Sequence, residues 1–306
     1  MIRRMYRVHR PSRSEFVPIR HLRYHVRQWG TPSTDQAPLV MVHGWMDVAA
    51  SFQFVVDAMA QDRWVIAPDW RGFGLTEVPE GTDHFWFPDY LADLDQLLDH
   101  FVGSRPVDLV GHSMGGHIAM LYAGVRPERV AKLINLEGFG LPATHPSQAP
   151  TRYAQWIDQI QTVPTGAMDL KSYDSMEGVV QRLIKTNPRL STDKARWLAQ
   201  HWSRQDTEGR WRVLGHPAHK IVNAQLFRVD EVLAVYQRIL APTLCVVAES
   251  NEMGQWWQDR YHLDEFMQRI AVVPQVEHVT VTEAGHMLHH DQPKVLAKLL
   301  ENFIRH

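Results

Sequence analysis

The sequence predicts an α/β fold in which a mostly parallel β-sheet is covered by helices on both faces. Short, almost entirely apolar runs bounded by turn residues alternate with segments of helical periodicity. Strands that are apolar on both sides are typical of parallel sheets, because helices bury both faces of such sheets. The chain has 306 residues, 44% hydrophobic and 22% charged, which suits one large α/β domain.

The predicted elements follow from this alternation. Buried strands are expected at 38–44, 64–69, 107–113, 130–137, 242–249 and 276–283. Helices are expected at 51–60, 88–101, 114–125, about 259–270 and 293–305. In 88–101, for example, leucines and Phe101 recur at spacings of three and four residues. Each helix between two strands provides the crossover that parallel strands need.

One long segment interrupts the alternation. Residues 141–235 contain helical patterns, many prolines and Trp156, Trp197, Trp202 and Trp211, but no clear buried strand. The sheet pattern resumes near residue 242. We therefore interpret 141–235 as a helical cap inserted after the sixth strand into a core formed by 1–140 and 236–306. A separate small helical domain is the alternative.

The amino-acid composition indicates which binding partners and which cellular compartment to expect. The formal net charge of −2 gives no reason to expect nucleic acid as a partner. No apolar stretch reaches the length of a transmembrane helix. The basic start, with Arg3 and Arg4, lacks the apolar run of a signal peptide and is interpreted as a solvated strand or arm. The single cysteine, Cys245, favours a reducing, cytoplasmic compartment. The expected partner is a small-molecule substrate, and the expected state is a monomer or homodimer.

The stretch Gly111-His112-Ser113-Met114-Gly115 has the pattern G-x-S-x-G between a predicted strand and a predicted helix. A serine at such a sharp turn is held in a strained backbone, where side chains at the flanking glycines would collide. The turn exposes the hydroxyl at the start of a helix, which favours developing negative charge. Ser113 is therefore the predicted nucleophile.

A serine nucleophile needs a base and donors for an oxyanion. His286 lies in the loop between the last predicted strand and the last helix, and it follows the serine in chain order as the base does in this arrangement. The turn His43-Gly44-Trp45 follows an early strand. The backbone N–H groups of Trp45 and Met114 are the predicted oxyanion donors.

His286, His289 and His290 form a close group that could also suggest metal ligands. No carboxylate stands at a familiar zinc spacing from them, so we predict no metal and no cofactor.

These motifs together resemble those of the α/β-hydrolase fold superfamily, within its lidded esterase and lipase-like group. The resembling stretches are HGW (43–45), DWRGFGLT (69–76), GHSMGG (111–116) and AGHMLHHDQP (284–293). HGWMDVAASF (43–52) is also similar to the serine hydrolase-like proteins of that superfamily. The resemblance implies an eight-stranded, mostly parallel sheet, a helical lid and no cofactor.

The resemblance leaves the reaction open, because this fold hosts many chemistries. Haloalkane dehalogenases and epoxide hydrolases attack with an aspartate, whereas this chain has Ser113. Hydrolysis of a carboxylic ester is the first expectation. C–C bond hydrolase, thioesterase, lactonase and cofactor-free perhydrolase follow. A catalytically silent protein that binds a small ligand is the alternative of a different class.

The position of the catalytic acid is unusual. Asn251 stands after the penultimate strand, where family members usually carry an aspartate. Glu137 stands at the end of the predicted strand 130–137, one strand earlier in the chain. The stretch LINLEGFGLP (133–142) resembles family members, including certain dehalogenases, that carry the acid at the end of this earlier strand. We predict Glu137 as the acid, with Glu252 as the alternative.

Aromatic residues near the motifs suggest an apolar site. His43, Phe73, Phe139 and the cap residue Trp156 are the predicted pocket residues, and they favour a small to medium, apolar or aromatic acyl group.

Overall fold

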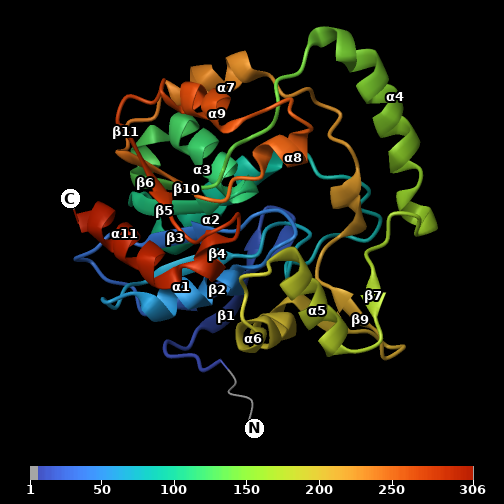
Figure 1. Ribbon diagram of the computed structural model, residues 1–306, viewed down its shortest axis with the longest axis horizontal. Coiled ribbons are helices and arrows are strands. Elements are labelled where there is room, and N and C mark those ends of the chain that lie inside the picture. The colour runs from blue at the N-terminus through green and yellow to red at the C-terminus, as the bar shows by residue number, and fades with distance from the viewer. Residues whose placement is uncertain (1–5, 306) are drawn as a thin grey trace.

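The computed structural model of the protein describes residues 6–305, so Arg3 and Arg4 lie outside the described residues. Its centre is an eight-stranded sheet in the order β1-β2-β4-β3-β5-β6-β10-β11, seen edge-on in Figure 1. The strands are β1 (Arg13–Ile19), β2 (Leu22–Trp29), β3 (Leu39–Val42), β4 (Val65–Pro68), β5 (Val107–His112), β6 (Val130–Leu136), β10 (Thr243–Ala248) and β11 (Val276–Val281). The pairs β1–β2 and β2–β4 are antiparallel and the other pairs are parallel. The predicted fold is confirmed.

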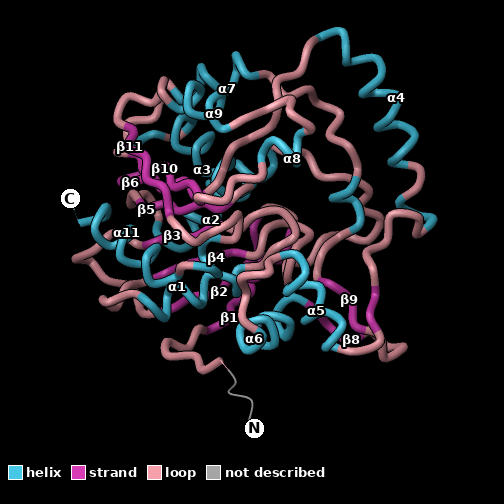
Figure 2. Tube along the Cα trace, viewed as in Figure 1, coloured by secondary structure: helices cyan, strands magenta, loops and turns pink. Residues whose placement is uncertain are grey.

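Helices bury both faces of this sheet. One face carries α2 (Pro88–Val102), α3 (Met114–Val125), α7 (Val229–Tyr236) and α9 (Leu263–Ile270). The other carries α1 (Gln53–Ala58), α10 (Leu288–Asp291) and α11 (Pro293–Arg305). Figure 2 shows the strands as a layer between the two groups. Successive residues of a central strand therefore enter opposite cores, which explains why β3, β4 and β10 are almost entirely apolar.

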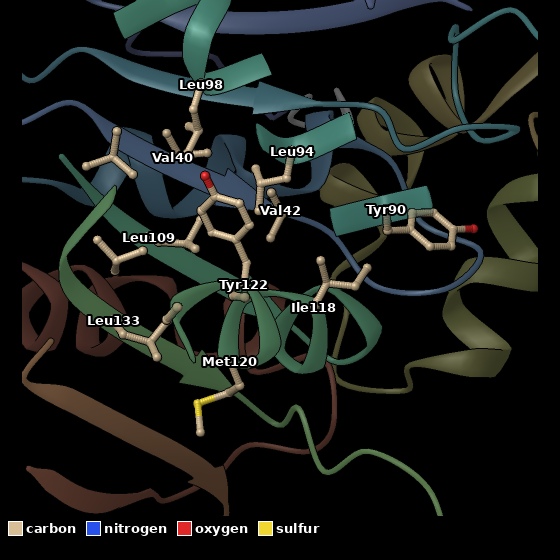
Figure 3. Packing of buried hydrophobic residues seen from close by; sticks show 14 of the residues in the cluster. Val40, Val42, Tyr90, Leu94, Leu98, Leu109, Ile118, Met120, Tyr122 and Leu133 are labelled. Carbon is tan, nitrogen blue, oxygen red and sulfur yellow. The ribbon is translucent and has the colours of Figure 1, made fainter. Parts of the chain in front are cut away.

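The packing in front of β5 and β6 fixes the helix that follows the predicted nucleophile. Ile118 and Tyr122 of α3 are at most 1% exposed and belong to the same core as Leu109 of β5 and Leu133 of β6. Figure 3 shows these side chains between the helix and the strands. The start of α3 is thus held rigidly at the end of β5.

Two predicted helix starts differ from the structure for local reasons. The helix predicted from residue 51 begins earlier, as a 3₁₀ turn, η1 (Ala49–Phe52), before α1. The helix predicted from about residue 259 begins at Leu263, because Gln258 and Asp259 adopt left-handed backbone angles that a helix excludes. Between β10 and α9 lies a further short helix, α8 (Met253–Trp257).

The segment 141–235 is mainly helical but also contains a small antiparallel sheet. Its helices are η3 (Pro146–Gln148), α4 (Ala149–Ile160), η4 (Val163–Thr165), α5 (Met176–Thr186), α6 (Thr192–Trp202), η5 (Pro217–Lys220) and α7. Its strands β7 (Ser172–Tyr173), β8 (Ser203–Gln205) and β9 (Trp211–Val213) pair in the order β7-β9-β8. Strands of two and three residues are too short to leave a periodic sequence signal.

The two ends of this segment attach to the core differently. Helices α5 and α6 share a hydrophobic cluster with Val48, Ala50 and Phe54, around the loop after β3. Helix α7 packs directly on α3, where a side chain at Gly124 would collide with the Val235 carbonyl. Within the described residues, α7 thus packs as part of the core, although it lies inside the predicted cap range. None of the described helices combines the length and apolar character needed to cross a membrane.

Candidate active site

Ser113 occupies the sharp turn between β5 and α3. Its backbone has φ 54° and ψ −118°, a region that residues with a side chain rarely adopt. The flanking glycines are required by close approach: a side chain at Gly111 would collide with the Gly115 carbonyl, and one at Gly115 with the Val42 carbonyl. The G-x-S-x-G spacing is therefore a steric consequence of placing the hydroxyl at the end of β5.

The structure brings Ser113, His286 and Glu137 together as one hydrogen-bonded chain. His286 Nε2 lies 2.9 Å from Ser113 Oγ, and His286 Nδ1 lies 3.2 Å from Glu137 Oε2. The other carboxylate oxygen, Oε1, accepts the Ala248 N–H at 2.6 Å. Glu137 is 2% exposed, whereas the side chain of His286 is 24% exposed. A buried carboxylate, an imidazole and an accessible hydroxyl in this order have the geometry of a nucleophile–base–acid triad.

The sheet order explains how Glu137 reaches His286. Strand β6, which ends beside Glu137, lies between β5 and β10. The C-terminal ends of these parallel strands share one edge of the sheet, so a residue after β6 lies next to the turn that carries Ser113. Glu137 itself has φ 57°, another strained backbone position.

The loop after β10, where family members usually carry the catalytic acid, does not supply an acid to His286 in this structure. Asn251 Oδ1 accepts the Met253 N–H at 3.0 Å, at the beginning of α8. Glu252 is exposed, and within residues 6–305 its carboxylate makes no hydrogen bond to His286. The position usually held by an acid is therefore used to begin a helix.

The loop after β3 approaches Ser113 from the other side. A side chain at Gly44 would come within 2.9 Å of Ser113 Cβ, so the loop that continues into Trp45 passes close to the nucleophile. Met114 is the first residue of α3, and its N–H therefore has no acceptor within the helix. Among the described residues, no oxygen accepts a hydrogen bond from either N–H. Their role as oxyanion donors stays a prediction.

Two of the predicted pocket residues are buried in packing instead. His43 is 0% exposed; the Trp70 N–H donates to its Nε2 at 2.9 Å, so its Nδ1–H donates to the Gly44 carbonyl at 2.7 Å. Phe73 is 1% exposed and stacks on His219 with ring centroids 3.7 Å apart. Both side chains are buried by packing against neighbouring loops, and this placement contradicts their predicted contact with substrate.

Phe139 and Trp156 have intermediate positions. Phe139 is 6% exposed and packs edge-on against Phe266 at 5.0 Å. Trp156 of α4 is half-buried, with its ring 6.0 Å from Trp86 in the loop before α2. Their contact with substrate stays a prediction.

An exposed tryptophan adjoins the triad, and a second one is exposed on the loop after β3. The ring of Trp256 in α8 meets His286 edge-on with centroids 4.5 Å apart, and Trp256 is 39% exposed. Trp45 is 53% exposed. The only sequence signal for Trp256 is its position a few residues after Asn251.

Two hollows lie elsewhere on the molecule. One, of about 320 Å³, is lined by residues of β2, α6 and β9, including Arg27 and His201. The other, of about 400 Å³, lies between Asn251 and Asp264. Ser113 lines neither, so neither of them is the pocket in front of the nucleophile.

Comparisons with known proteins place the chain in a family. Residues 37–293 match the family model of the alpha/beta hydrolase fold. A serine hydrolase-like protein of Danio rerio is 25% identical over 300 residues, covering 97% of this chain and 90% of the relative. A 2-hydroxy-6-oxo-2,4-heptadienoate hydrolase of Pseudomonas putida is 36% identical over 107 residues, covering 34% of this chain and 38% of the relative.

Solved structures show the same fold. The thioesterase domain from the curacin biosynthetic pathway has a TM-score of 0.81 at 23% identity, covering 95% of this chain and 99% of that one. An E-2-(acetamidomethylene)succinate hydrolase has a TM-score of 0.74 at 21% identity, covering 97% and 100%. With a matching family model over most of its length, the chain belongs to the alpha/beta hydrolase fold family.

Proposed function

We propose that this protein is a serine hydrolase that cleaves carboxylic esters through an acyl-enzyme. The observation that supports it is the continuous chain of contacts from Ser113 Oγ through His286 to the buried carboxylate of Glu137, at 2.9 and 3.2 Å. A chain of this kind has one evident chemical use, which is to raise the nucleophilicity of the serine hydroxyl.

In the proposed reaction, Ser113 Oγ attacks the ester carbonyl while His286 Nε2 takes its proton. Glu137 accepts the Nδ1–H and stabilises the imidazolium that forms. The N–H groups of Met114 and Trp45 receive the oxyanion of the tetrahedral intermediate. His286 then returns the proton to the leaving alcohol. Water repeats the sequence on the acyl-enzyme and releases the acid.

The substrate side of the proposal rests on the surroundings of His286. Trp256 presents exposed aromatic surface beside His286, and Trp45 on the loop after β3 is also exposed. No described arginine or lysine makes a hydrogen bond or ion pair with Ser113, His286 or Glu137. An acyl group that is apolar or aromatic, and not strongly anionic, suits these neighbours.

A fluorophosphonate probe tests the function directly. The proposal expects stoichiometric labelling of the purified protein at Ser113, together with turnover of p-nitrophenyl esters that depends on acyl length. An unlabelled, folded protein would instead be a silent ligand binder, which contradicts the proposal.

C–C bond hydrolysis is the second candidate. It is favoured by the Pseudomonas putida relative, whose name states a 2-hydroxy-6-oxo-2,4-heptadienoate substrate. The same preparation should be offered that dienoate and a thioester beside the esters. The ester proposal expects the highest kcat/KM for an ester, and a clearly higher value for the dienoate would replace it with the C–C reaction.

We further propose that the cap, residues 141–235, sets acyl preference through Trp156. Trp156→Ala is expected to change the ratio of kcat/KM between short and long acyl esters by roughly threefold to tenfold, because the pocket gains apolar space. Tyr153→Ala is the matched control, since Tyr153 lies one turn earlier on α4 and is 53% exposed. An unchanged ratio in Trp156→Ala would contradict a pocket contact.

A further inference from the structure

Next to His286, whose ring lies 4.9 Å from that of His112, three buried side chains converge. Asp47, His112 and His289 each offer one possible metal-ligand atom, and these atoms lie within 4.8 Å of one another. Asp47 follows β3, His112 ends β5 and His289 belongs to α10. They are 3%, 1% and 0% exposed. Three distant parts of the chain therefore meet at one point inside the protein.

The converging atoms lack hydrogen-bond partners. Asp47 Oδ1 accepts from Ser51 Oγ and from Trp202 Nε1, but no described residue donates to Oδ2. His289 Nε2 and His112 Nδ1 are likewise unpartnered among residues 6–305. Buried polar atoms without a partner are rare in proteins and cost free energy, so a group of three at one point calls for an occupant.

The hydrogen bond of His112 prepares one of these atoms for a metal. Its Nε2 lies 2.8 Å from the His286 carbonyl oxygen, which can only accept, so Nε2 carries the proton. The Nδ1 atom then has a free lone pair, and no described residue donates a hydrogen bond to it. An outer hydrogen bond that fixes the tautomer of a histidine in this way is the usual support of a metal ligand.

The spacing of the cluster agrees with a small ion. Asp47 Oδ2 and His289 Nε2 are 3.6 Å apart, slightly too far for a hydrogen bond. Two ligands of a tetrahedral zinc ion, with bonds of about 2.0 Å, are about 3.3 Å apart. The separation of these two atoms is therefore close to that of two ligands of one zinc ion.

We propose that Asp47, His112 and His289 bind a divalent transition-metal ion of the zinc type. Two imidazole nitrogens and one carboxylate oxygen are ligands that zinc and its neighbours in the first transition series accept. The sequence predicted no metal, because no carboxylate stands at a familiar zinc spacing from His286, His289 and His290. In the structure the carboxylate comes from the loop after β3.

The site has a structural role. A bound ion joins the loop that carries Trp45, the strand that carries the nucleophile and the turn that carries His286. None of its three ligands belongs to the chain of contacts formed by Ser113, His286 and Glu137. This inference is independent of the proposed ester hydrolysis.

Metal titration of the full-length protein tests the site. After treatment with a chelator, the wild type is expected to bind one equivalent of Zn²⁺ tightly by calorimetry, and its thermal midpoint should rise. Co²⁺ in its place should give the intense visible absorption of a four-coordinate ion. Asp47→Asn, which keeps an oxygen for Trp202, and His289→Phe, which suits the neighbouring Phe52, should weaken binding by on the order of 100-fold or more.

His117→Gln is the matched control, because His117 is also a buried histidine but lies on α3, where it bonds Tyr236. This variant should bind zinc as the wild type does. The protein has 18 histidines, so the position of the ion matters as well as its stoichiometry. In zinc-soaked crystals of the wild type, an anomalous peak is expected between Asp47 and His289.

Two results would overturn the proposal. One is that the wild type does not bind one equivalent of Zn²⁺ tightly, which would mean that buried water occupies the cluster. The other is an anomalous peak only at surface histidines. Both use the wild-type protein, so they decide the matter even if a variant fails to fold.

Discussion

Ser113→Ala is expected to lower kcat for ester hydrolysis by on the order of 10⁴–10⁶, with little change in thermal stability. The alanine has no nucleophilic atom, whereas the helix start, the neighbouring N–H groups and the acyl pocket remain. Ester hydrolysis by the purified variant, measured as initial rates over a range of substrate concentrations, checks this. Retention of more than about one hundredth of the wild-type kcat would contradict the assignment.

The matched control is Ser175→Ala. Ser175 also precedes a helix, α5, and its side chain makes no capping hydrogen bond. Its replacement should leave kcat unchanged. The double variant Ser113→Ala/His286→Ala should be no slower than Ser113→Ala alone, because members of a catalytic unit contribute non-additively.

The fold could be predicted from the sequence because its signals are local. Strands β3 to β6 and β10 are buried on both faces over most of their length, so each appears as an apolar run. The predicted nucleophile could be located for the same reason, since the glycines that permit the turn are neighbours of Ser113 in the chain.

Contacts between distant segments could not be predicted in this way. The packing that buries His43 and Phe73 depends on Trp70 and on His219, which comes from a 3₁₀ turn of the insertion. The convergence of Asp47 on His289 depends on how the loop after β3 folds against α10. In each case the motif indicated the position of a residue along the chain, but side-chain direction was set by tertiary packing.

Glu137→Gln is expected to lower kcat by about 10⁴, as loss of the carboxylate from a Ser-His-acid triad does. In the wild type the two carboxylate oxygens have different partners. Oε1 accepts the Ala248 N–H at 2.6 Å, and Oε2 faces His286 Nδ1 at 3.2 Å. A glutamine has only one oxygen to serve both positions, so its orientation decides the outcome.

The Ala248 N–H is a buried donor and requires an acceptor, so it takes the amide oxygen of the introduced glutamine. The amide NH₂ group then faces His286 Nδ1. A donor at that position forces Nδ1 to accept and moves the ring proton to Nε2. In that tautomer Nε2 cannot take the proton of Ser113, so the variant loses its base although every other residue stays in place.

Glu252→Gln is the control that separates the two candidate acids, because Glu252 is exposed and begins α8. It should keep kcat close to the wild-type value. Both variants should be compared on one p-nitrophenyl ester, with thermal midpoints measured alongside. A drop of several orders of magnitude in Glu252→Gln, with Glu137→Gln near normal, would mean that the loop after β10 rearranges to supply the acid. Because the Ala248 N–H orients the amide, Glu137→Gln should lose activity by holding His286 in the wrong tautomer. Proton NMR of the His286 ring should then find the proton on Nε2 in the variant and on Nδ1 in the wild type.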